Sequence, residues 1–136
     1  MKRILMIDDE PIMCRHIANI LKAKFDIEVI VHSNYYHLDK LLEVGIDAII
    51  LDVMMPFDKS YFTEIDCNED YPEFSTGIYL FKKIRRKYPK LPIIFHTAYQ
   101  GNIECDSRST IICKPNLAIN VADTINKFVM RCEKLE

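Results

Sequence analysis

The chain has 136 residues, of which 49% are hydrophobic, and its formal net charge at pH 7 is −2. This length is enough for one domain with its own core, and we expect no second domain. The small, mixed charge gives no sign of a nucleic-acid-binding surface, and five cysteines without a C-x-x-C pair indicate neither a disulfide framework nor a zinc site.

The first predicted element is a short buried strand, Ile4 to Ile7, which Asp8 and Asp9 follow directly. Its apolar run is too short for a signal peptide or a membrane span, although two basic residues precede it. We therefore expect a cytoplasmic protein without membrane insertion.

The chain continues as helix, strand, helix and strand. A one-sided apolar stripe after Pro11 predicts a helix at 11–24, and runs of branched residues predict strands at 27–31 and 47–54. Between these strands, a helix is predicted at 38–44, which Gly45 ends. The last of these four elements is a buried strand of aliphatic residues that brings Asp52 to its C-terminal end. Asp52 is therefore the residue whose surroundings need an explanation, because a buried carboxylate requires a partner.

The second half repeats this alternation. A helix with a basic outer face opens at Gly77 and stops before Pro89, and a last helix starts at Asn116, a predicted N-cap. Two strands lie between these helices, at 92–97 and 110–113. The order predicts an α/β fold with a doubly wound, five-stranded parallel sheet.

Four of the five predicted strands end in polar residues at the C-terminal edge of the sheet: Asp8 and Asp9, Asp52, Thr97, and Lys114. Because the carboxyl ends of parallel strands meet at one edge, we expect these side chains to converge. Three carboxylates repel one another unless a hard cation such as Mg²⁺ lies among them. Asp52 is the central candidate nucleophile, since an aspartate can accept a phosphoryl group as an acyl phosphate. His96, beside Thr97, should turn away from this edge and be a hydrogen-bonded core histidine.

The motifs Ile-Asp-Asp-Glu-Pro, Leu-Asp-Val-Met-Met-Pro, His-Thr-Ala and Cys-Lys-Pro, in this order, resemble the receiver domain of two-component response regulators, a flavodoxin-like fold. The resemblance spans nearly the whole chain and implies a single-domain response regulator that signals by protein contact. Its partners would be a histidine kinase or phosphotransfer protein and a downstream protein target, with no direct contact to nucleic acid. Enzymatic activity would be limited to its own phosphorylation and dephosphorylation.

The resemblance also implies residue roles. Asp52 would be the phosphorylation site, and Mg²⁺ would be bound by Asp9 directly, by Asp8 directly or through water, by Asp52 and by the backbone carbonyl of Met54. The phosphoryl oxygens would be contacted by Thr97 and Lys114, which would also couple the site to the rest of the domain.

Two other functions stay open. An aspartyl-nucleophile phosphatase also starts from an aspartate at a strand end, but the second acid of such enzymes would fall at Met54, which cannot be a general acid. A receiver-like adaptor that binds partners without phosphorylation is the other alternative. The intact set of chemical positions argues against it.

The first departure from the family is an insertion at about 57–76. Twenty residues separate Pro56 from Gly77, whereas receivers usually reach this glycine soon after the proline. The segment contains six acids against Lys59 as its one basic residue, and it is rich in aromatic rings. It is either a solvated loop whose rings cover part of the core or a lid or partner-binding arm. In the second case Tyr61, Phe62, Tyr71 and Phe74 are the candidates for a partner interface. We expect it to pack over the third helix or to dock a partner.

The second departure lies between Thr97 and Lys114. This stretch has too few apolar residues for an amphipathic helix, so helix four of the family should be shortened or absent. Ile111 takes the place of the family's aromatic switch residue, which excludes the usual ring rotation. Receivers control water access to the phosphoryl group from two positions, here Met54 and Tyr99, and neither side chain would orient a water molecule, so the phosphoryl group should persist.

Overall fold

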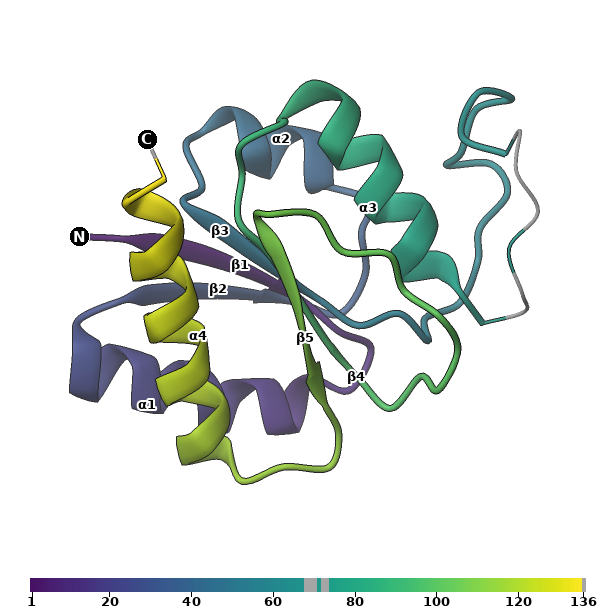
Figure 1. Ribbon diagram of the computed structural model, residues 1–136. Helices are drawn as coiled ribbons and strands as arrows, with labels where there is room; N and C mark the ends of the chain where they lie inside the picture. The colour runs from purple at the N-terminus through teal and green to yellow at the C-terminus, as the bar shows by residue number, and fades with distance from the viewer. Residues whose placement is uncertain (68–70, 72–73, 136) are drawn as a thin grey trace.

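The computed structural model describes residues 1–67, 71 and 74–135 of the chain. They fold into a parallel sheet with helices on both of its faces (Figure 1). Its strands are β1 (Arg3–Ile7), β2 (Glu28–His32), β3 (Ala48–Leu51), β4 (Ile93–Thr97) and β5 (Ser109–Cys113). Its helices are α1 (Pro11–Phe25), α2 (Leu38–Glu43), α3 (Thr76–Lys87) and α4 (Ala118–Glu133). The sheet order β2-β1-β3-β4-β5, with all pairs parallel, confirms the predicted doubly wound α/β fold.

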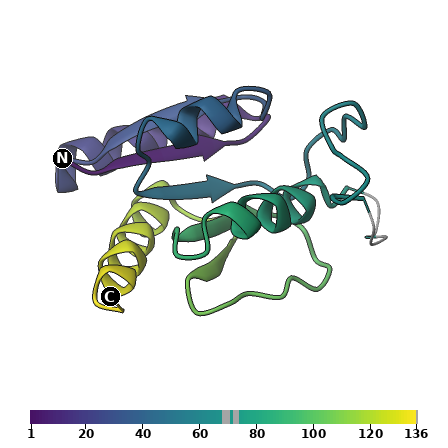
Figure 2. The same ribbon diagram turned by 90° about the horizontal axis from the view of Figure 1, so that it is seen from above.

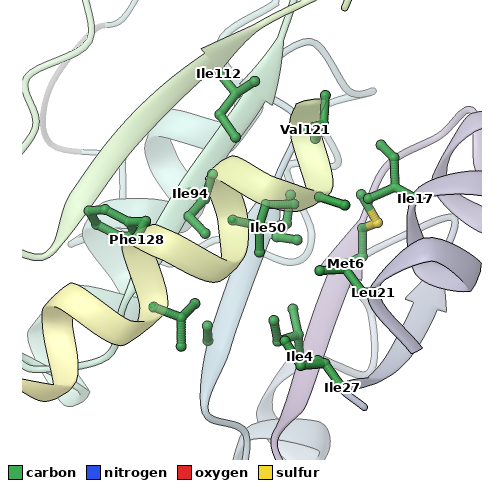
Figure 3. Close-up of a cluster of buried hydrophobic side chains, with 14 of the residues drawn as sticks. Ile4, Met6, Ile17, Leu21, Ile27, Ile50, Ile94, Ile112, Val121 and Phe128 are labelled. Carbon is green, nitrogen blue, oxygen red and sulfur yellow. The ribbon is translucent and has the colours of Figure 1, made fainter. Parts of the chain in front are cut away.

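Two apolar layers cover the sheet, because its central strands are buried on both faces. Residues of α1 and α4 pack on one face against Ile4, Met6, Ile50 and Ile94 (Figure 3). On the other face, α2 and α3 pack against the alternate residues of the same strands, and Figure 2 shows these layers from above. None of the described helices is long and apolar enough to span a membrane.

The register of the central strands brings the ends of β1 and β3 to one level. Ile7 is paired with Leu51, and the backbone N–H of Asp52 donates to the carbonyl of Ile7 at 3.1 Å. The next residue of each strand is thus an aspartate, Asp8 or Asp52. Parallel pairing places both at the same edge of the sheet.

The end of β3 and the start of α4 differ from the prediction in ways that have a physical reason. β3 ends at Leu51 instead of Met54, because β1 also ends there and the chain turns, with the N–H of Met55 donating to the carbonyl of Val53 at 3.1 Å. The N-cap of α4 is Leu117, and the side chain of Asn116 accepts the N–H of Leu117 instead of one inside the helix. Asn116 therefore ends the preceding loop and does not cap α4.

No helix forms at 98–108, as the shortage of apolar residues predicted. This stretch is attached through Arg85 of α3, which donates to the carboxylate of Asp106 at 2.8 and 3.2 Å and to the carbonyl of Leu91 at 2.6 Å. Ile111 on β5 is 39% exposed, so the surface that helix four would cover is open there.

The insertion projects beside the N-terminal end of α3 (Figure 1). Residues 68–70 and 72–73 of it lie outside the described part of the chain. In the described part, the hydroxyl of Tyr35 donates to the carbonyl of Pro56 and accepts the N–H of Asp58, both at 2.8 Å. Further along, the carboxylate of Asp66 forms ion pairs with Lys83 and Arg86 of α3. The described part of the insertion is thus attached to α3 and to the loop before α2.

Candidate functional site

Three carboxylates meet at the C-terminal edge of the sheet. One oxygen atom from each of Asp8, Asp9 and Asp52 lies within 4.8 Å of the others. Asp8 and Asp52 are buried, whereas Asp9 is exposed. The convergence expected from the strand ends is therefore present in the structure.

The backbone around Asp52 fixes the direction of its carboxylate. Its Oδ1 atom accepts the N–H of Met54 at 3.1 Å. Gly77 allows the start of α3 to approach this turn, because an added Cβ would lie 2.4 Å from the carbonyl oxygen of Asp52. The N–H of Gly77 donates to the carbonyl of Val53 at 3.0 Å. A glycine is thus required where α3 meets the turn that carries Asp52.

Among the described residues, Lys114 supplies the one ammonium group that pairs with these acids. Its Nζ atom donates to Oδ2 of Asp8 at 2.7 Å and to Oδ2 of Asp52 at 3.3 Å. Burial by itself lowers the pKa of Lys114, but the two carboxylates outweigh it and raise that pKa above its ordinary value. Lys114 therefore stays charged at neutral pH.

Thr97 orients the other oxygen of Asp52. Its hydroxyl donates to Oδ1 of Asp52 at 2.8 Å and accepts the N–H groups of Val53 and Tyr99 at 3.4 and 3.2 Å. Thr97 is itself buried. Both oxygens of the Asp52 carboxylate thus have a hydrogen-bond donor.

The donor set suits Mg²⁺, which prefers oxygen ligands and is usually bound in proteins through one or two carboxylates. One ammonium faces three carboxylates, so negative charge remains at the site. Burial raises the pKa of Asp9 most, and repulsion from the charges of Asp52 and Asp8 raises it further. A divalent cation would offset this repulsion, and Asp8, Asp9 and Asp52 are the residues that could bind one.

A cavity of about 450 Å³ opens in front of Asp52 and Lys114. Its wall includes three residues that the strand-end argument did not select, namely Glu10, Met13 and Asn116. Glu10 and Asn116 lie on the turns that follow β1 and β5, one or two residues from the strand-end polar groups, and only this proximity along the chain could have indicated them. Met13 lies in the first turn of α1, which starts directly after the turn that carries Asp8 and Asp9. Met54 borders the cavity and is 41% exposed.

Two expectations for single residues need correction. His96 is buried as expected, but its Nδ1 atom has no hydrogen-bond partner among the described residues, and the side chain borders the cavity. Burial and the charge of Lys114 lower the pKa of His96, which favours the neutral ring. Tyr99 was expected to flank the path of water, yet its ring packs against Gly101, where an added Cβ would meet the hydroxyl at 2.3 Å.

The aromatic candidates of the insertion separate into two pairs. Phe62 is buried, and Tyr61 is half-buried with a hydroxyl that has no partner among the described residues, so these two rings belong to the core beside α3. Tyr71 is half-buried and Phe74 is 67% exposed. Phe62 was therefore a wrong choice as a contact residue, because apolar burial against α3 takes it away from the surface.

No family model matches the chain. One curated protein, the protein-glutamate methylesterase/protein-glutamine glutaminase of Trichodesmium erythraeum (strain IMS101), is 39% identical over 98 residues, which are 71% of this chain. This chain spans 23% of that relative's length. The activities in its name are those of the longer protein.

Several solved structures share the fold. The CheY-like receiver domain protein of Methanospirillum hungatei JF-1 superposes with a TM-score of 0.71 at 20% identity, covering 100% of this chain and 99% of that one. A receiver domain protein from Clostridium thermocellum gives 0.67 at 21% identity over 100% of both chains. TrrA from Thermotoga maritima, solved in complex with Mg²⁺ and BeF, gives 0.60 at 24% identity, covering 94% of this chain and 99% of that one. The chain has the fold of response-regulator receiver domains.

Proposed function

We propose that this chain, a receiver domain by its fold, accepts a phosphoryl group on the carboxylate of Asp52 from a histidine kinase or a phosphotransfer protein. The observation that supports this most is the placement of Asp52. Its carboxylate is buried, accepts hydrogen bonds from Thr97 and Lys114, and borders an open cavity.

In the reaction, an oxygen of Asp52 attacks phosphorus, a new P–O bond forms, and the P–N bond to the donor histidine breaks. The electron pair of that bond stays on the imidazole nitrogen, which takes up a proton. Lys114 and Thr97 move from the carboxylate oxygens to the transferred phosphoryl oxygens, where charge accumulates. The buried thiol of Cys14 does not compete, because burial and the charge of Asp8 raise its pKa to about 12.

Mg²⁺ would be held by Asp8, Asp9, Asp52 and the backbone carbonyl of Met54. When bound, the ion supplies positive charge that offsets the carboxylates and the phosphoryl oxygens. Asp9, the exposed member of the cluster, needs least rearrangement to bind a cation, whereas Asp8 is paired with Lys114. Replacing Asp9 with alanine should therefore reduce Mg²⁺ binding more than the same change at Asp8.

The proposal is tested by measuring intact mass after incubation with acetyl phosphate, with and without Mg²⁺. We expect one added phosphoryl group that requires Mg²⁺, is removed by hydroxylamine as an acyl phosphate, and is absent from Asp52→Asn. Asp58→Asn, a neutralised aspartate in the nearby insertion, is the matched control and should be labelled like the wild type. Equal labelling of Asp52→Asn would refute the assignment, and no labelling of the wild type would favour the phosphorylation-independent adaptor.

We further propose that signalling is by protein contact and that the surface of the insertion takes part in it. The usual output surface of a receiver includes helix four, which this chain lacks between Thr97 and β5. Replacing residues 57–76 with a short receiver loop should leave labelling of Asp52 in place and abolish binding of the downstream target. If kinase pairing and target binding were both unchanged, the output would have to lie elsewhere.

A further inference from the structure

His96 is a buried polar side chain at the carboxylate site that the proposed reaction does not use. The residue is 2% exposed, and its Nδ1 atom has no hydrogen-bond partner among the described residues. An enclosed nitrogen without a partner is unfavourable, because it loses its hydrogen bonds with water and gains none in return. Such groups are rare in folded proteins, so this one needs an explanation.

The register of the sheet places His96 beside Asp52. Leu51 of β3 is paired with Phe95 of β4, so the next residues of the two strands, Asp52 and His96, are at the same level. Ile94, two residues before His96, packs in the layer of α1 and α4 (Figure 3). Because side chains alternate between the two faces of a strand, His96 is on that face as well. It forms part of the wall of the cavity in front of Asp52.

The charges of the site act on the His96 ring. Burial lowers the pKa of His96 most and the charge of Lys114 lowers it further, whereas the charges of Asp8 and Asp52 act in the opposite direction. The ring is therefore neutral at neutral pH, with a proton on one nitrogen and a lone pair on the other. The positive charge of Lys114 favours a lone pair on the nitrogen that faces it.

Lys114 has hydrogen-bonding capacity that is not fully used. An ammonium has three N–H groups, and among the described residues Lys114 donates to two acceptors, Asp8 and Asp52. Both belong to the carboxylate cluster that could bind Mg²⁺. Carboxylate oxygens that bind a cation are lost to the ammonium as acceptors, so Lys114 needs others. An imidazole nitrogen stays available, because Mg²⁺ prefers oxygen ligands.

We propose that His96 is a positioning residue: when Mg²⁺ binds the carboxylates, Nδ1 of His96 accepts a hydrogen bond from the ammonium of Lys114 and holds it beside the phosphoryl group at Asp52. The inference rests on the proposed function and adds a residue to its site. The ring stays neutral throughout, and no covalent step is added. This acceptor keeps the ammonium inside the cavity and thereby also favours Mg²⁺ binding.

The first test is a double-mutant cycle on Mg²⁺ affinity, measured by calorimetry with the full chain. His96→Leu removes the acceptor, whereas His96→Asn keeps one, since the amide oxygen of asparagine takes about the place of Nδ1. We expect His96→Leu to weaken Mg²⁺ binding about tenfold and His96→Asn to stay within about twofold of the wild type. In Lys114→Gln, which has no ammonium, adding His96→Leu should change nothing. His37→Leu, at an exposed histidine, is the control and should bind like the wild type.

The second test observes the ring in the wild-type chain, so it decides the proposal even if a variant does not fold. In protein with isotope-labelled histidines, the NMR signal of Nδ1 of His96 should move upfield when Mg²⁺ is added, as expected for a lone pair that accepts a hydrogen bond. The ring proton should stay on Nε2. A histidine with a merely structural role would keep its Nδ1 signal, and the ring signals of His37 should not move.

The proposal is overturned if the Nδ1 signal of His96 does not respond to Mg²⁺, if His96→Leu binds Mg²⁺ like the wild type, or if it weakens binding equally in Lys114→Gln. None of these measurements needs a phosphoryl group. Labelling of the wild type with an unchanged Nδ1 signal would therefore refute this inference alone. The expected Nδ1 response without labelling by acetyl phosphate would support the contact between His96 and Lys114 and refute the proposed function.

Discussion

Replacing Asp66 with asparagine tests whether charge attaches the insertion to α3. The Asp66 side chain is fully buried, pairs with Lys83 at 3.2 Å and with Arg86, and accepts the N–H of Thr63 at 2.9 Å. Burial alone would raise the pKa of this carboxyl, but the hydrogen bonds from Thr63, Lys83 and Arg86 outweigh it and lower the pKa from 3.8 to about 2. A decrease of this size corresponds to about 2 kcal/mol of stability when the carboxylate is charged.

We therefore expect Asp66→Asn to lower the free energy of unfolding by about 2 kcal/mol at neutral pH, measured by urea denaturation. Because the folded-state pKa is below the unfolded one, this stabilisation is complete above the unfolded pKa and is lost as pH falls through the folded pKa. The difference between wild type and variant should thus be constant above about pH 5 and shrink between about pH 4 and pH 2. Hydrogen exchange should also become faster in residues 60–67.

Glu64→Gln is the control for Asp66→Asn, because it removes the same charge from an exposed position in the same segment. It should change the free energy of unfolding by less than about 0.5 kcal/mol. If both variants lost the same stability, or if the loss at Asp66 did not depend on pH, the ion pairs would not be what attaches the insertion to α3.

Three further predictions concern the carboxylate site. Gly77→Ala should destabilise the fold by about 1–3 kcal/mol in urea denaturation and slow labelling of Asp52, because its Cβ would lie 2.4 Å from the Asp52 carbonyl; wild-type stability would contradict the contact. Lys114→Gln should bind Mg²⁺ several-fold more tightly in a calorimetric titration, since it removes the competing ammonium, yet accept phosphate more slowly; weaker Mg²⁺ binding would refute this. Met54→Asn should shorten the lifetime of the phosphorylated protein, followed by intact mass, whereas rapid loss from the wild type would show that Met54 does not restrict water.

Local sequence patterns were sufficient to predict the sheet and the placement of its acids. Branched apolar runs alternate with amphipathic stretches, and parallel crossovers bring all strand ends to one edge, so Asp8 and Asp52 had to meet. The lack of a helix at 98–108 was predictable for the same local reason, since a helix without an apolar face gains little from packing.

Hydrogen-bond partners and side-chain surroundings depended on the tertiary structure. No local pattern indicates that the ammonium of Lys114 lies nearer to Asp8 than to Asp52, or that Tyr99 packs against Gly101 instead of facing the site. In the insertion, sequence showed only that acids and rings are mixed. Which acid and which rings are buried against α3 was decided by contacts between segments far apart in the chain, because burial and charge pairing depend on distances that the order of residues does not contain.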